Sequence, residues 1–98
     1  MATLKQETSR FLANVPEEFA FWSYPGHTLR NMKELGDELR TMSNDNYAYH
    51  VNPEKNDFAN WVKDIIKDEK LAADLKKAPD RVQASRAVAN RIAILSRR

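Results

Sequence analysis

Cysteine is absent from this 98-residue chain, and glycine occurs only twice, as Gly26 and Gly36. Without cysteine the chain forms no disulfide and no thiolate metal site, which is typical of proteins of a reducing compartment. We therefore predict a cytoplasmic protein. Because two isolated glycines cannot make a glycine-rich loop that cradles phosphates, the dinucleotide-binding and P-loop classes are excluded.

Long apolar runs are also missing. No segment approaches the roughly 20 apolar residues that span a bilayer, and the first residues, MATLKQETSRF, lack the apolar centre of a signal peptide. The net charge is only +2, from 16 basic and 14 acidic side chains, which does not by itself indicate a nucleic-acid partner. We expect no association with membranes.

The composition is that of one globular domain, with 42% hydrophobic and 31% charged residues. The periodicity predicts a mainly α fold: a compact bundle of about four to five short helices with at most one small β-hairpin near residues 19–29. Residues 1–15 form an N-terminal segment that is either a short helix or frayed, and residues 16–98 form a single helical domain.

The hairpin prediction depends on the segment FAFWSYPGHTL. Phe19, Phe21 and Ser23 alternate with Ala20 and Trp22, and Tyr24-Pro-Gly is a strong turn signal. We expect residues 19–23 to pair with residues 27–29. Alternation directs Trp22 away from Phe21, so that Trp22 and the turn residue Tyr24 are candidates for exposure to solvent.

The first helix is predicted to begin after Asn31 as N-cap, with Glu34 as its capping partner. Gly36 lies on the apolar stripe of this helix, and its cost of about 1 kcal/mol indicates a close-packed neighbour such as an aromatic ring, with simple tolerance as the alternative. The stripe consists of Met32, Leu35, Leu39 and Met42.

The stretch YAYHVNPEKNDFANW packs four aromatic residues and a histidine into fifteen positions. Tyr47 and Tyr49 cannot face the same way on one helix, so one ring is expected to be more exposed. Asn56 or Asn52 caps the helix that follows, which carries the cleanest amphipathic pattern in the chain. The predicted structural core consists of Phe58, Trp61, Val62, Ile65 and His50.

Two further helices are predicted near the C-terminus. Asp68 caps a short one, and Ala78-Pro79-Asp80 opens the last one with Pro79 at its first helical position. Ile94 falls among the polar residues of that last helix and is expected to be exposed. Its inward face is predicted to contain Val82, Ser85, Val88, Ala89, Ile92 and Leu95.

The segments Tyr49-His50-Val51 and Asn56-Asp57-Phe58, followed by Trp61 and the run KDEKLA, resemble a family of small uncharacterised prokaryotic domains. That family joins an aromatic-aromatic-His segment to an Asn-Asp-Phe-x-x-Trp helix start. The resemblance covers roughly residues 19–75. It implies an architecture with a Phe-x-Phe strand, a glycine turn and a leucine-rich helix, and it transfers no activity, cofactor or catalytic residue.

The two histidines raise two chemical hypotheses, catalysis and metal binding. His50 and Asp57 could act as an oriented general base, yet no nucleophile or oxyanion signature accompanies them. The alternative is a structural histidine bonded to a backbone carbonyl or to Asp57. Only His27 and His50 could bind a metal through imidazole, and their spacing matches no known motif. We expect no enzyme, no cofactor and no metal site.

The leading hypothesis is a non-enzymatic protein-interaction or self-association module. Its possible partner surface contains Trp22, Tyr24, Arg86, Arg91, Ile94 and Arg97. The alternative is nucleic-acid binding through the last helix, where five arginines, Arg81, Arg86, Arg91, Arg97 and Arg98, stand against the single acid Asp80. Arginines whose stems merely cover apolar surface give the same pattern.

Overall fold

The computed structural model describes residues 10–24 and 26–96, and its fold is mainly helical, as predicted. The strands pair in two antiparallel two-stranded sheets. The elements are η1 (Glu17–Phe19), β1 (Phe21–Ser23), β2 (His27–Leu29), α2 (Met32–Thr41), α3 (Asn44–His50), β3 (Val51–Asn52), β4 (Lys55–Asn56), α4 (Asp57–Trp61), η2 (Val62–Ile66), α5 (Glu69–Lys77) and α6 (Arg81–Leu95).

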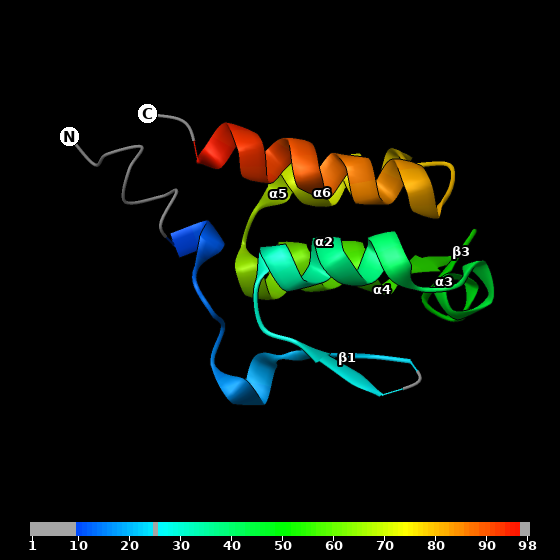
Figure 1. Cartoon of the computed structure of the whole chain (residues 1–98), viewed down its shortest axis with the longest axis horizontal. Coiled ribbons are helices and arrows are strands. Elements are labelled where there is room, and N and C mark those ends of the chain that lie inside the picture. Colours follow the sequence, from blue (N-terminus) through cyan, green and yellow to red (C-terminus); the bar gives the residue numbers. More distant parts are fainter. Residues whose placement is uncertain (1–9, 25, 97–98) are drawn as a thin grey trace.

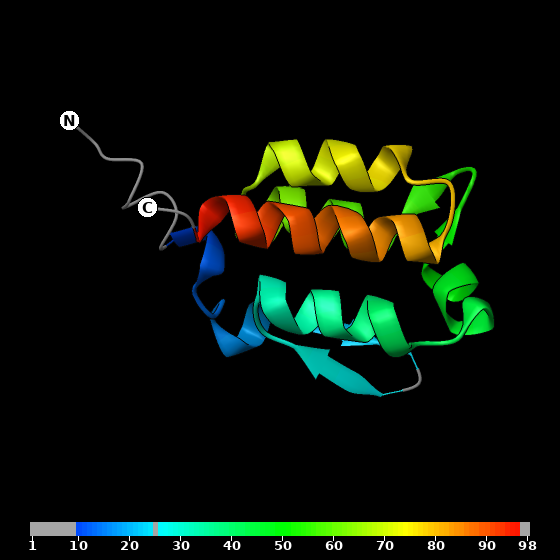
Figure 2. The same ribbon diagram turned by 45° about the horizontal axis from the view of Figure 1, so that its top comes forward.

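The elements are stacked in three levels. Helices α5 and α6 lie on one side, α2 and α4 lie in the middle, and the β1–β2 hairpin lies on the other side of α2 (Figure 1). The turned view keeps this order, with α6 beside α2 and the hairpin beyond α2 (Figure 2). Consequently the hairpin and the two C-terminal helices expose separate surfaces.

The predicted hairpin is present, although its first strand starts at Phe21 rather than Phe19, which belongs to η1. Phe21 pairs with Leu29 and Trp22 with Thr28. Because side chains alternate along a strand, Ser23 and Leu29 are buried whereas Trp22 is exposed, as expected. The second pairing, Val51–Asn52 with Lys55–Asn56, was not predicted, because two residues per strand leave no alternation to detect.

Side-chain caps begin the helices α2 to α6. Each capping oxygen accepts the backbone N–H three residues further on, which satisfies one of the unpaired donors of the first turn. The prediction for Pro79 is wrong: Asp80 is the N-cap and Pro79 precedes it, outside the helix. The carboxylate of Glu34, the predicted capping partner, accepts the backbone N–H of Arg30, one residue before the N-cap Asn31. The caps are Asn31, Ser43, Asn56, Asp68 and Asp80.

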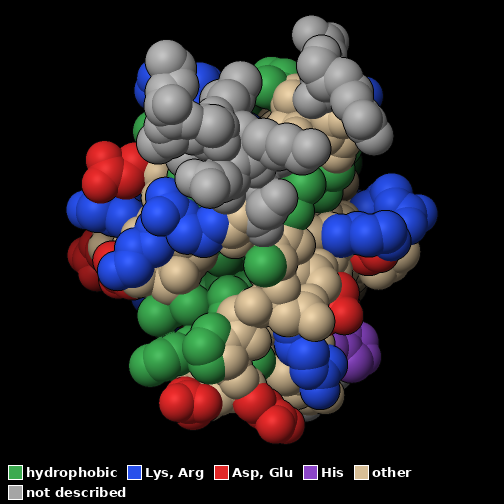
Figure 3. Space-filling view, turned by 90° about the vertical axis from the view of Figure 1, so that its left-hand side faces the viewer, with side chains coloured by type: hydrophobic (Ala, Val, Ile, Leu, Met, Phe, Trp, Pro, Cys, Tyr) green, Lys and Arg blue, Asp and Glu red, His purple; other side chains and the backbone are tan. Residues whose placement is uncertain are grey.

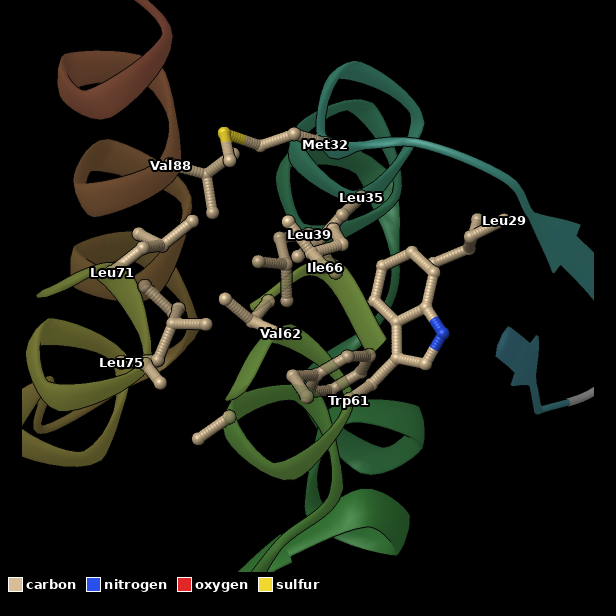
Figure 4. Packing of buried hydrophobic residues seen from close by; sticks show 14 of the residues in the cluster. Leu29, Met32, Leu35, Leu39, Trp61, Val62, Ile66, Leu71, Leu75 and Val88 are labelled. Carbon is tan, nitrogen blue, oxygen red and sulfur yellow. The ribbon is translucent and has the colours of Figure 1, made fainter. Parts of the chain in front are cut away.

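The core lies between α2, α4, α5 and α6. Trp61 lies on the side of the core that faces Leu29 of the hairpin, and Leu71 and Leu75 of α5 lie on the opposite side (Figure 4). The indole N–H of Trp61 donates to the carbonyl of Phe19 at 2.8 Å, so the ring also fixes η1. Four of the predicted core residues are buried, namely Phe58, Trp61, Val62 and His50, and Ile65 is partly buried against them.

Helix α6 is rotated relative to the prediction. Val82 and Ala89 are exposed, and the buried residues are Ala84, Val88 and Leu95. Val88, which was predicted to face inward, packs closely against Gly36 of α2: a Cβ added at Gly36 would lie 3.1 Å from Val88 Cγ1. The expected close neighbour of Gly36 therefore exists, but it is a valine and not an aromatic ring.

Most of the predicted N-terminal helix lies outside the described residues. Residues 10–12 have helical conformation. Phe11, Leu12 and Val15 pack against the same core as the rest of the chain, and the N–H of Val15 donates to the carbonyl of Arg30 at 2.7 Å. The start of the described chain is thus attached to the end of the hairpin.

Candidate functional site

His50 joins three elements at one point. Tyr24 donates its backbone N–H to Nε2 of His50 at 3.0 Å, and Nδ1 lies 3.0 Å from a carboxylate oxygen of Asp57. Because Nε2 accepts a hydrogen bond, the proton is on Nδ1 and is donated to Asp57. His50 closes α3, Asp57 opens α4 and Tyr24 follows β1. We call this arrangement the histidine junction.

Aromatic rings enclose the histidine junction. The His50 side chain is only 4% exposed. The rings of Phe21, Tyr49 and Phe58 lie with centroids 5.1 to 5.2 Å from the imidazole. Both ring nitrogens are occupied, which leaves neither of them facing a substrate in this conformation. The pairing with Asp57 agrees with the structural interpretation of His50.

The second histidine belongs to a cluster that the sequence analysis missed. His27 Nδ1 lies 2.9 Å and 3.0 Å from the two carboxylate oxygens of Glu38, and the hydroxyl of Ser23 donates to Glu38 at 2.8 Å. Ser23 is fully buried and has no hydrogen bond to the imidazole, so the three side chains do not form a nucleophilic triad. They fasten the hairpin to α2. The signal that could have predicted this cluster is Glu38, a carboxylate beside the apolar stripe of Leu35 and Leu39.

Trp22, Tyr24 and Tyr49 form a continuous exposed group, which we call the aromatic surface. The Tyr24 and Tyr49 rings stack at 4.5 Å with an angle of 22°, and Trp22 meets Tyr24 edge-on at 6.2 Å. Their exposed fractions are 53%, 39% and 54% for Trp22, Tyr24 and Tyr49. Tyr47, two residues from Tyr49, is buried against Phe58, so the expected difference between the two α3 tyrosines is confirmed.

The arginines of α6 differ in their surroundings. Arg91 binds both carboxylate oxygens of Asp68, which is 1% exposed, at 2.8 and 3.1 Å. Arg81 donates to the carbonyls of Leu39 and Arg40 at 2.7 and 3.0 Å. Arg86 is exposed and has no ion-pair partner among residues 10–24 and 26–96. Arg97 and Arg98 lie outside the described residues.

Asp68 is buried because of the turn that precedes it. Lys67 ends η2 in the left-handed conformation, with φ of 76°, and its N–H returns to the carbonyl of Val62 at 2.7 Å. This reversal directs Asp68 inward, where it caps α5 and binds Arg91. The sequence predicted the cap, but it gave no signal for the ion pair.

An open groove of about 390 Å³ runs between α5 and α6. Its α6 wall contains Arg86, Asn90 and Ile94, which lie on one face of the helix, and its α5 wall contains Lys70 and Lys77. Ile94 is 53% exposed, as expected. Figures 1 and 2 place α5 and α6 on the opposite side of α2 from the hairpin. The structure therefore does not bring Ile94 and Trp22 into one patch.

A third region of exposed apolar side chains lies at the end of the molecule that contains η1. Figure 3 shows hydrophobic groups at that end among acidic and basic ones. Phe19 of η1 is half-exposed while its carbonyl accepts from Trp61.

Among the described residues, two ionisable side chains have shifted pKa values. Burial raises the pKa of the Tyr47 phenol, and the negative charge of Asp80 adds to this effect. On the exposed side of α2, the hydrogen bond from Lys33, together with its charge and that of Arg40, lowers the pKa of Asp37. Neither group lies in the aromatic surface or in the groove.

Within the described ranges, no group of three or more His, Cys, Asp or Glu side chains is arranged to hold a metal ion. Over the same residues, none of the helices has both the length and the apolar content that crossing a membrane requires.

The chain matches no protein-family model, and no significant match was found among curated proteins or solved structures.

Proposed function

We propose that this protein is a non-enzymatic interaction module that uses the aromatic surface of Trp22, Tyr24 and Tyr49 to bind a protein partner or a second copy of itself. The observation that carries the proposal is the mutual packing of three rings that all remain exposed. From their exposed fractions the rings offer roughly 300 Å² of aromatic area. This area is similar to that of the largest apolar patch on a typical monomeric protein, and such patches are often functional.

The aromatic surface lies directly over the histidine junction. Tyr24 donates its backbone N–H to His50, and Tyr49 precedes His50 in α3 and packs edge-on against its ring. Rings held in place before binding lose little conformational entropy when a partner covers them. Aromatic residues also contribute most often to the energetic centres of protein interfaces. The histidine junction thus serves the proposed function as a support for the rings.

The charges near the aromatic surface favour an uncharged or weakly charged partner face. Asp45 is the one Asp, Glu, Lys or Arg residue in the elements that form this surface, which are β1, Tyr24, β2 and α3. A stacking platform for single-stranded nucleic acid normally has cations beside its rings. A protein face, including that of a second copy, needs none.

Nucleic-acid binding through α6 is the second candidate function. It is supported by the composition of α6, which contains three arginines and no acid. Against it stand the internal contacts of Arg81 and Arg91, which leave Arg86 as the one arginine of α6 whose side chain has no hydrogen bond or ion pair to another described residue.

We further propose that the chain is a member of the uncharacterised prokaryotic family that it resembles. The residues that support this proposal are Tyr49-His50-Val51, Asn56-Asp57-Phe58 and Trp61.

The proposed function is tested by site-specific photo-crosslinking and by sedimentation velocity. A benzophenone amino acid at position 22 is expected to give one discrete adduct in cells of the source organism, or a dimer of the purified chain at increasing concentration. The same probe at Val82, an exposed apolar position on α6, is the matched control. Tyr49→Ala should abolish the adduct or the dimer.

Two results would contradict the proposed function. Absence of both adduct and concentration-dependent mass with the probe at position 22 contradicts it. Equal crosslinking from positions 22 and 82 shows non-specific contact and contradicts it as well. Circular dichroism of each variant verifies that the fold is retained.

A further inference from the structure

The groove between α5 and α6 is the second candidate surface of the molecule. It is open and has a volume of about 390 Å³, within the range typical of ligand-binding clefts. Its charged lining residues are four cations and one carboxylate, namely Lys70, Lys77, Arg86, Arg91 and Asp74, and its amides are Gln83 and Asn90. The apolar groups Ala78, Ala87 and Ile94 also line it.

Two of the four cations that line this groove already have an ion-pair partner. Lys70 is held by Asp74 of the same helix at 3.0 Å, and Arg91 is held by the buried Asp68. Lys77 and Arg86 have no ion-pair partner among the described residues and stand on opposite walls. Two free cations facing a shared cleft favour a ligand with negative charges on both of its sides.

Helix α6 presents apolar groups to solvent as well as to the core. Ile94 is about half-exposed and lines the groove, whereas the exposed residues Val82, Ala89 and Ala93 lie outside it. A helix that serves only to cover a core has a polar outer face. Helix α6 instead combines exposed apolar groups with arginine and has no carboxylate. The ligand that complements it is both acidic and apolar.

We propose that the α5–α6 groove binds an acidic, amphipathic peptide segment of a partner protein. Carboxylates of the segment pair with Arg86 and Lys77 on the two walls, and an apolar side chain packs on Ile94. This site is independent of the aromatic surface, which lies beyond α2 (Figures 1 and 2). The protein would then hold two partners at once.

A nucleic acid fits the groove less well than such a peptide. Phosphate backbones are bound by many cations together, whereas this groove has two that are uncommitted and the chain has a net charge of +2. A phosphate chain also leaves the exposed Ile94 without a complementary contact. Both arguments favour the peptide.

The test is a selection from a random peptide library displayed on phage, with the intact chain immobilised. Enriched peptides are synthesised with a fluorophore, and their affinity is measured by fluorescence anisotropy. We expect acidic residues flanking an apolar one. Arg86→Glu should weaken binding at least tenfold through charge reversal, and Ile94→Ser should weaken it at least threefold.

Two variants serve as controls. Arg40→Glu reverses an exposed cation on α2, outside the groove, and should change the affinity by less than twofold. Trp22→Ala should also leave it unchanged, which separates this site from the aromatic surface. All four altered residues are exposed, so each variant is expected to fold.

Three outcomes overturn the proposal. The first is that no acidic peptide is enriched. The second is that binding of the enriched peptides survives Arg86→Glu or depends on Trp22. The third is that a fluorescent oligothymidylate binds, is lost on Arg86→Glu and ignores Ile94→Ser while the acidic peptides fail to bind. That last result would assign the groove to nucleic acid.

Discussion

At the scale of single residues, the two tryptophans occupy opposite environments. Trp61 is buried and donates to the carbonyl of Phe19, whereas Trp22 is more than half-exposed and contacts Tyr24. Removing a buried aromatic side chain loses its transfer free energy and leaves a cavity. The same change at an exposed position loses little.

We predict that Trp61→Ala lowers the free energy of unfolding by about 3–5 kcal/mol. Trp22→Ala, the matched control, should lower it by less than about 0.5 kcal/mol. Urea denaturation followed by circular dichroism measures both values. Equal losses in the two variants would show that the assignment of the two rings is wrong.

The two histidines offer a second matched pair. His50 is buried and accepts the N–H of Tyr24, while the His27 side chain is 64% exposed beside Glu38. His50→Ala leaves that N–H without its acceptor and opens a cavity, at a cost of about 3 kcal/mol. His27→Ala removes an exposed imidazole and leaves the buried Glu38 with its hydrogen bond from Ser23, at a lower cost of about 1 kcal/mol. Thermal unfolding of both variants gives the comparison, and a harmless His50→Ala would refute the junction.

At the scale of elements, Arg91 and Asp68 connect α6 to the start of α5. Arg91→Ala leaves an almost fully buried carboxylate without its partner, which costs about 3–5 kcal/mol. The control Arg86→Ala, on the same helix but exposed, should cost less than about 0.5 kcal/mol. Chemical denaturation decides the matter, and similar values for the two arginines would contradict the buried pair.

The contact of α2 with α6 can be tested at Gly36. Alanine at this position gains up to about 1 kcal/mol of helix propensity but puts Cβ 3.1 Å from Val88 Cγ1. Val88 is fully buried, and its branched side chain has few alternative rotamers in a helix. We predict that Gly36→Ala does not stabilise the natural protein.

In a Val88→Ala background the same Gly36→Ala change should raise the free energy of unfolding by up to about 1 kcal/mol. A double-mutant cycle measures this coupling. Additive effects of the two substitutions would show that the helices do not approach as closely as the structure indicates.

At the scale of the whole molecule, the hairpin is attached to the bundle by two apolar side chains, Phe21 and Leu29, and by a few polar contacts. The polar contacts are the bond of Tyr24 to His50 and the cluster of Ser23 and His27 on Glu38. By contrast, α2 and α6 face each other along the core through residues such as Met32 and Val88 (Figure 4). The hairpin has strands of only three residues, and most of their side chains are not buried. Short segments that bury fewer apolar side chains than the helices open locally before the whole domain unfolds.

We therefore predict that amide hydrogens of α2 and α6 exchange only through global unfolding, while those of the hairpin exchange faster. Hydrogen exchange read by NMR measures the difference residue by residue. Asp57→Ala, which removes the carboxylate that holds His50, should accelerate exchange at Tyr24 further. Hairpin amides as slow as those of α2 would contradict this picture.

Features encoded by neighbours in the chain were predictable. Helix positions followed from apolar spacing, and the caps Asn31, Asn56 and Asp68 followed from side chains that reach an N–H three residues away. The exposure of Trp22 followed from strand alternation. The start of α6 was predicted incorrectly because two neighbouring residues can both mark a helix start. Asp80 is the N-cap and accepts the N–H of Gln83, so Pro79 lies outside the helix.

The class of fold, the hairpin and most of the aromatic residues that fill the core thus followed from the amino-acid sequence alone. The rotation of α6, the pairing of Arg91 with Asp68 and the assembly of Trp22, Tyr24 and Tyr49 depend on how the chain packs in three dimensions. The two pairings join residues far apart in the chain, 23 positions for Arg91 and Asp68 (91 − 68) and 25 for Tyr24 and Tyr49 (49 − 24). Periodicity and capping act over a few residues, so they cannot specify which distant side chains meet.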